Sequence, residues 1–176
     1  MPGAMTAAPA DVDWTVTVTE PLPNCPSVEA CWEKLATQTK WGEWRSPSKL
    51  RGKDIATTVV PPATEPLRIG DEYVVSVGRF MKIRCRVIES SSPGSTSAEG
   101  GETVFDATGV ALGGIVKARF RFTAFRGEGG VVMARAQEKM TIMSLSLLAP
   151  SRETLEAEHR HTFKDLNESF LSTSRA

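Results

Sequence analysis

Residues 115–142, IVKARFRFTAFRGEGGVVMARAQEKMTI, carry the pattern that decides the expected fold. Apolar and polar residues alternate on both sides of Gly127–Gly130, which is typical of strands that bury one face. A short glycine-rich segment between two such runs is typical of a hairpin turn. The stretch therefore predicts two antiparallel strands, over residues 115–125 and 131–142.

Five further segments upstream show strand patterns: residues 14–19, 55–60, 71–77, 80–89 and 103–108. Strands that follow one another through short turns predict an antiparallel meander. The polar residues 90–101 are expected to form a flexible loop within it. Between the first two strands, Ser27 is a good N-cap for a short helix, and a second short helix or turn is predicted over Lys40–Trp44.

The C-terminal segment predicts one long helix, from about Ser151 to Phe170. Its apolar face combines residues at helical spacing: Leu155, His159, Thr162, Phe163, Leu166 and Phe170. One helix cannot fill the concavity of a curved sheet, so some internal space should remain. We therefore expect an α+β fold in which a curved antiparallel six- to seven-stranded sheet wraps around this helix and encloses a pocket.

The composition is that of one ordinary globular domain: 176 residues, 40% hydrophobic and 24% charged. Ala, Pro and Gly dominate the start, so residues 1–12 are predicted to be a mobile tail and residues 13–176 a single domain. Lys and Arg number 21, as do Asp and Glu, which argues against a general nucleic-acid binder. No apolar stretch is long enough for a membrane span.

The cysteines and the N-terminal residues bear on the compartment. Cys25, Cys31 and Cys85 are an odd and sparse set without a CxxC pair, so a reducing compartment is favoured over a disulfide framework. The first residues have neither the basic nor the apolar region of a secretory signal. A cytoplasmic protein is therefore expected.

Several motifs, in their order along the chain, resemble the START/SRPBCC helix-grip superfamily, in particular its polyketide cyclase/dehydratase-like branch. The matching stretches are residues 28–44 (VEACWEKLATQTKWGEW) followed by Pro47; Leu67–Gly70, a Leu-x-x-Gly motif; Phe120–Phe122; Gly127–Gly130 with Glu138; and Phe163 with Leu166–Asn167.

This resemblance covers about residues 14–171 and implies a helix-grip fold with a ligand cavity. It does not imply one chemistry, because the superfamily includes carriers, enzymes and binding modules. The family often has a glycine soon after the hairpin glutamate, whereas this chain has Met140–Met143. The loop at residues 145–149 is therefore expected to shape the pocket entrance differently.

Three inward-facing residues are the catalytic candidates. Glu138 shares the apolar face of its strand, and a buried carboxyl must be paired, hydrogen-bonded or protonated, which suits a general acid or base. His159 lies at the centre of the helix stripe and suits proton transfer. Tyr73 would orient a substrate oxygen. A structural glutamate, a core histidine and a tyrosine at the sheet rim are the alternatives.

Ligand contacts are expected from residues that face the predicted pocket or border its entrance. Trp44 and Arg45 end the second short helix, beside the expected entrance. Inward positions of the strands and the long helix supply the others: Cys85, Phe120, Phe122 and Phe163.

No metal or cofactor is predicted. His159 and His161 stand at i and i+2, so they cannot both reach one ion, and the cysteines lie in separate elements. No nucleotide-binding GxGxxG or GxxxxGK[ST] motif is present, nor a GxSxG nucleophile motif.

The leading hypothesis is a protein that binds a hydrophobic or aromatic small molecule in an internal cavity. It would be a cofactor-independent cyclase, dehydratase or isomerase acting on a polyketide-like intermediate. The alternative is a non-catalytic carrier of a lipid or isoprenoid. A third hypothesis is a regulatory module that binds a partner protein. It would lead over both the enzyme and the carrier if the core were solid, with no cavity large enough for a drug-sized molecule. A homodimer is left open.

Overall fold

The computed structural model describes residues 14–46, 48–50, 53–58, 66–77, 81–92, 103–142 and 150–173. Within these ranges the chain forms one antiparallel sheet and three α-helices, so the predicted α+β class is confirmed. The predicted tail and the loop at 145–149 lie outside the described residues. So does most of the predicted loop at 90–101, of which Ser90 and Ser91 belong to a strand.

The sheet has eight strands in the described part of the chain, in the order β1-β8-β7-β6-β5-β4-β3-β2. All neighbouring strands are antiparallel. Their bounds are β1 Val16–Pro21, β2 Ser48–Leu50, β3 Lys53–Thr58, β4 Glu72–Val77, β5 Met81–Ser91, β6 Thr103–Ala111, β7 Val116–Arg126 and β8 Val132–Ile142. Seven of them overlap the predicted segments. The three-residue β2 is the addition, because it is too short to show an alternation.

The predicted hairpin is the β7–β8 pair. Its turn contains a short 3₁₀ segment, Glu128–Gly130, in which Gly129 has φ 72° and Gly130 has φ 81°. Residues with side chains rarely adopt these angles, which explains the glycines. The turn sets the register in which Phe120 lies opposite Glu138. On the other side of β8, Glu138 pairs with Val16 of β1.

The helices are α1 (Val28–Ala36), α2 (Trp41–Trp44) and α3 (Arg152–Thr173), with a 3₁₀ turn, Gln38–Lys40, between the first two. The predicted cap at Ser27 is present, and Ser151 caps the long helix. The Ser27 Oγ accepts a hydrogen bond from the Ala30 N–H at 3.1 Å, and the Ser151 Oγ accepts one from Thr154 at 3.2 Å. The long C-terminal helix is therefore confirmed, and it runs one turn further than predicted.

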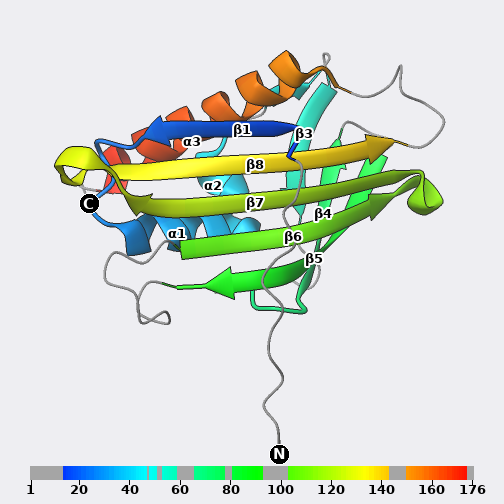
Figure 1. The fold of residues 1–176 in the computed structure, drawn as a ribbon, viewed down its shortest axis with the longest axis horizontal. Coiled ribbons are helices and arrows are strands. Elements are labelled where there is room, and N and C mark those ends of the chain that lie inside the picture. The colour runs from blue at the N-terminus through cyan, green and yellow to red at the C-terminus, as the bar shows by residue number, and fades with distance from the viewer. Residues whose placement is uncertain are drawn as a thin grey trace, which may run out of the picture.

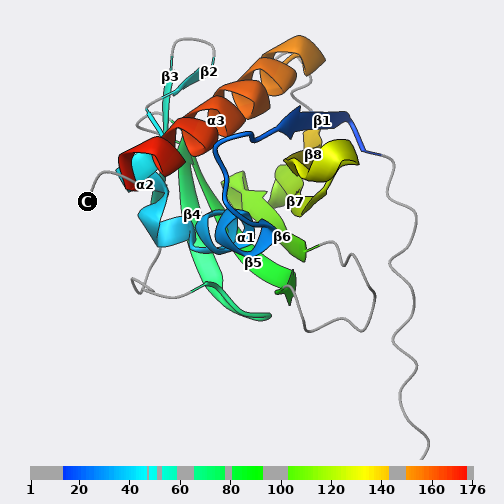
Figure 2. The ribbon, with the colours of Figure 1, turned by 90° about the vertical axis from the view of Figure 1, so that its left-hand side faces the viewer.

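The helices lie on one side of the curved sheet (Figures 1 and 2). Helix α3 packs on β1, and α1 packs on β6 and β7. The core lies between these helices and the inner face, where alternate residues of β8 are buried: Val132, Ala134, Ala136 and Glu138. No helix in the described ranges is long and apolar enough to cross a membrane.

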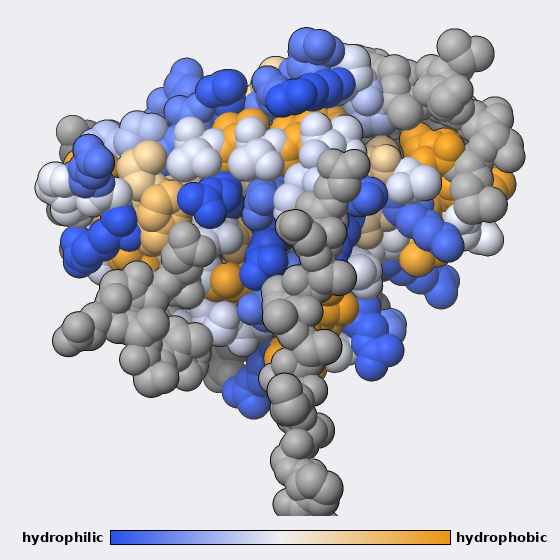
Figure 3. All heavy atoms as spheres, viewed as in Figure 1, coloured by the Kyte–Doolittle hydropathy of each residue, from blue (hydrophilic) through white to orange (hydrophobic). Residues whose placement is uncertain are grey.

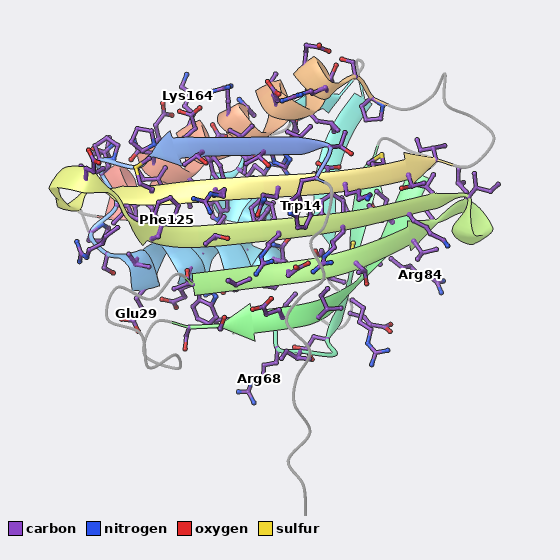
Figure 4. All side chains as sticks on the ribbon, viewed as in Figure 1. Trp14, Glu29, Arg68, Arg84, Phe125 and Lys164 are labelled. Carbon is purple, nitrogen blue, oxygen red and sulfur yellow. The ribbon has the colours of Figure 1, made fainter. Side chains whose placement is uncertain are left out.

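The outer face of the sheet carries hydrophilic side chains with smaller apolar areas between them (Figure 3). Arg84 projects from this outer side, and Trp14 lies over the middle of the sheet (Figure 4). The Trp14 ring stacks 5.4 Å from the guanidinium of Arg119, which binds the buried carboxylate of Asp106.

Candidate functional site

An internal cavity of about 80 Å³ lies between the inner face of the sheet and the helices. Strands β4, β5, β7 and β8 form one wall, and α3 with the segment from α1 to α2 forms the other. Its lining comprises Gln38, Trp41, Arg45, Tyr73, Val75, Ile83, Phe120, Phe122, Glu138, Met140, Leu155, Glu158, His159 and Thr162. Most of this lining is apolar, and the ionisable groups come from several elements, with Glu158 and His159 both on α3.

Glu138 and His159 meet at this cavity. The Nε2 of His159 lies 3.0 Å from the Oε2 of Glu138, within hydrogen-bond distance. Glu138 is only 4% exposed and His159 only 6%. The pairing arises because the alternation of β8 turns Glu138 inward and the periodicity of α3 turns His159 toward the sheet. A buried carboxyl and a buried imidazole in contact can pass a proton to each other or to a bound molecule.

A second, partly buried pair, Arg45 with Glu158, borders the same cavity. Arg45 follows the last residue of α2, and its Nη2 donates to the Oε1 of Glu158 on α3. Burial lowers the pKa of Arg45, while Glu158, Asp165 and Glu138 act in the opposite direction. The guanidinium lies 5.3 Å from the centre of the Trp41 ring, a cation–π distance.

Aromatic rings connect the two pairs. The Trp41 ring meets Phe122 edge-on at 5.3 Å, and Phe122 meets the His159 ring at 6.2 Å. The indole N–H of Trp41 is anchored by the carbonyl oxygens of Lys34 and Leu35, both at 3.1 Å. This anchoring holds the Trp41 ring as a fixed part of the cavity wall.

Tyr73 lines the opposite side of the cavity, on β4. Burial, together with neighbouring Cys85 and Asp106, raises the pKa of Tyr73 well above its usual value. Its phenol stays protonated at neutral pH, and its hydroxyl lies within hydrogen-bonding reach of the Cys85 thiol. Cys85 lies opposite Tyr73 in the β4–β5 pair, and burial raises the pKa of its thiol to about 12.

The structure places the predicted site residues in two groups. Six of them line the cavity: Glu138, His159, Tyr73, Arg45, Phe120 and Phe122. The other three do not. Cys85 lies behind Tyr73 in the core, and Phe163 is 1% exposed within the packing of α3. Trp44 contacts Trp41 at 5.5 Å but lines a surface groove with Lys34 and Phe170.

Cavity residues that the sequence did not indicate include Trp41, Gln38 and Glu158. Gln38 and Trp41 lie in segments of three and four residues, respectively, which are too short to show a periodicity. Glu158 precedes His159, and its only sequence signal was its place beside the apolar stripe of α3.

Across the part of the chain that the structure describes, no group of three or more His, Cys, Asp or Glu side chains could hold a metal ion.

Comparison with known proteins bears on the fold. The chain is similar to the crystal structure of a hypothetical protein from Helicobacter pylori, with a TM-score of 0.63 and 11% identity over 88% of this chain and 86% of that one. A putative uncharacterized protein from Rhizobium leguminosarum gives a TM-score of 0.50 and 8% identity over 90% and 93%. No family model and no curated protein sequence matches the chain. These likenesses show a shared fold alone.

Proposed function

We propose that the protein binds a hydrophobic or aromatic small molecule in this cavity and acts on it by proton transfer, as a cofactor-independent enzyme of the cyclase, dehydratase or isomerase type. The substrate would be a polyketide-like intermediate, and the fold would belong to the helix-grip class. The observation that carries the proposal is the buried Glu138–His159 pair, 3.0 Å apart, at the edge of an apolar cavity.

The energetic cost of that pair supports a functional role. Burying a carboxylate and a histidine removes both from water, and buried ion pairs often contribute no net stability compared with apolar residues. Two such pairs around one cavity, Glu138–His159 and Arg45–Glu158, are more than packing requires. Acid–base chemistry in a site sheltered from water is a use that would justify this cost.

The volume of the cavity limits the ligand. Pockets for drug-sized molecules measure about 300–1,000 Å³, and an apolar cavity of roughly 150 Å³ accepts benzene. At about 80 Å³, the cavity is smaller than either, so a benzene-sized or larger ligand enters only if the lining moves. Val75, Phe120 and Met140 are the partly buried apolar side chains of the strand wall, and a rotamer change at Phe120 or Met140 would enlarge the cavity.

The same volume favours a second candidate function, a module that binds a partner protein. In that case the cavity would be a packing defect, and the two ion pairs would serve to fix the position of α3. A carrier of a long lipid or isoprenoid is less well supported, because such a chain would need several times the present space.

Deuterium uptake by a ketone would test the enzymatic proposal. 2-Tetralone, a bicyclic ketone with acidic C–H groups, would be incubated with the protein in D₂O and followed by proton NMR. The proposal predicts uptake faster than in buffer. Val75→Phe, which fills the cavity, should abolish the increase, whereas Val74→Phe, at the neighbouring outward position of β4, should retain it.

Uptake no faster than in buffer, together with unchanged ligand NMR signals, would count against both cavity functions and favour the partner-binding module. Equal uptake in Val75→Phe and the native protein would place the activity outside the cavity and would also contradict the proposal.

A further inference from the structure

On one edge of the Arg45 guanidinium, only one of the two nitrogens has a hydrogen-bond partner among the described residues. Its Nη2 donates to Glu158, but the Nε of Arg45 is buried and has no hydrogen-bond partner among the described residues. Nε and Nη2 point to the same side of a guanidinium and form the fork that binds two oxygens side by side. A buried N–H without an acceptor lowers the stability of the folded protein. An acceptor is therefore expected at this position, and the described side chains do not supply one.

The position of Arg45 limits where that acceptor could come from. The guanidinium is held between Trp41, at 5.3 Å, and the carboxylate of Glu158, and all three residues line the cavity. Glu138 and His159 line the same cavity, so a molecule inside it lies beside both Arg45 and the proton-transfer pair.

The charges around Arg45 determine which kind of oxygen fits. Three carboxylates, from Glu158, Asp165 and Glu138, already lie close enough to act on its positive charge. An added carboxylate would bring a further negative charge into a poorly hydrated site that already contains Glu158 and Glu138. A neutral carbonyl oxygen accepts the same hydrogen bond without adding a full charge.

We infer that Arg45 binds a neutral carbonyl oxygen of the ligand through its Nε–H, so that the cavity selects ketones or esters over carboxylates and over hydrocarbons of the same shape. This inference rests on the proposed function, because it requires a ligand in the cavity. It adds a positioning contact in the same cavity as the proton-transfer pair and narrows the substrate class to neutral carbonyl compounds.

Three molecules of nearly equal shape separate the possibilities: acetophenone has a neutral carbonyl, cumene has no oxygen, and benzoate has a carboxylate. Their dissociation constants would be measured by ligand-observed NMR. Because a hydrogen bond to a charged donor is strong, acetophenone should bind about tenfold or more tightly than cumene. Benzoate should bind more weakly than acetophenone.

The Arg45 Nε–H proton gives a direct readout in ¹⁵N-labelled protein, where arginine side-chain signals resolve from the backbone. The signal that disappears in Arg45→Lys should shift on addition of acetophenone and stay in place with cumene. Arg45→Lys keeps the positive charge beside Glu158 but removes the fork, so it should reduce the preference for acetophenone over cumene to less than about threefold. Arg84→Met, on the outer face, is the matched control and should retain the preference.

Glu158→Gln sharpens the test of charge. It removes one carboxylate from Arg45, so benzoate affinity should rise by about tenfold or more while cumene affinity stays constant. This variant keeps the size of the side chain, and melting curves would confirm that it folds.

The failures can be told apart. Equal affinity for acetophenone and cumene, or a preference that persists in Arg45→Lys, would overturn the Arg45 assignment and leave cavity binding intact. Tightest binding of benzoate by the native protein would overturn the selection of neutral oxygens. If none of the three molecules bound, both this inference and the proposed function would fall.

Discussion

The two faces of the sheet each bury a carboxylate, and they hold it in different ways. On the outer face, Asp106 is 0% exposed and accepts hydrogen bonds from Nε and Nη2 of Arg119 at 2.8 to 3.2 Å. The Nε of Arg121 lies 3.9 Å from the Oδ2 of Asp106. On the inner face, Glu138 contacts His159 at 3.0 Å and borders a cavity.

This difference teaches that burial of a carboxylate does not by itself mark a functional site. Asp106 is neutralised by two permanently charged guanidiniums, and Trp14 stacks on one of them. These contacts make Asp106 a structural anchor that links β6 to β7. Glu138 has a partner that can gain or lose a proton, and it borders the cavity. Only the second arrangement suits proton transfer.

The largest expected effect is on turnover, and it should separate the two carboxylates. Glu138→Gln keeps the shape of the side chain but removes the group that accepts a proton. We expect it to reduce deuterium uptake by 2-tetralone about 10²- to 10⁴-fold, the usual contribution of a general acid or base. Asp106→Asn is the matched control on the other face and should leave uptake within about twofold of the native protein. Equal losses in the two variants would remove the distinction between the faces.

The next effect is on stability, where Asp106→Asn should have the larger effect of the two substitutions. Asp106→Asn leaves Arg119 and Arg121 without their shared carboxylate. Removing one partner of a buried ion pair costs several kcal/mol, but both arginines keep about a fifth of their side chains exposed, so a loss of about 2 kcal/mol is expected. Urea unfolding would measure it. A change below about 0.5 kcal/mol would show that the outer network is not an anchor.

The smallest effect concerns the pH response of the inner face. Tyr73 is the single tyrosine of the chain, so tyrosinate absorbance reports on it alone. Burial raises its pKa, with Cys85 and Asp106 adding to the shift. In the unfolded chain Tyr73 ionises near pH 10, before it does in the folded protein. The stability that it contributes should therefore be complete below about pH 10 and decline as the pH rises toward the folded-state pKa.

The measurement is a titration of tyrosinate absorbance on folded protein beside the same protein in denaturant. The folded sample should titrate at clearly higher pH. Coincident curves would mean that Tyr73 is in contact with water, and that the cavity wall on β4 is open.

Much of the fold was predictable because strands and helices each have a characteristic periodicity within a short stretch of sequence. The alternation in β7 and β8 placed Phe120, Phe122 and Glu138 inward, and the helical stripe placed His159 against the sheet. The strand β2 was not predictable, because three residues are too few to show any period.

The candidate site was predictable only in part, because contacts between distant elements have no local signal. The inward direction of Glu138 and His159 followed from two independent periods, but the 3.0 Å contact depends on how α3 crosses β8. Pairing of Arg45 with Glu158 depends on where α2 ends. Burial of Asp106 depends on arginines from the next strand, which no local pattern in β6 indicates.

A mutant cycle on the Glu138–His159 pair tests the central claim most directly. Uptake of deuterium by 2-tetralone would be measured for Glu138→Gln, His159→Gln and the double variant, with melting temperatures as the control. If the pair transfers protons as one unit, each single change should reduce the rate of uptake at least about tenfold. The rate of the double variant should then lie no more than about threefold below that of the slower single variant. Full activity in either single variant, or a double variant whose loss equals the product of the two single losses, would contradict the account.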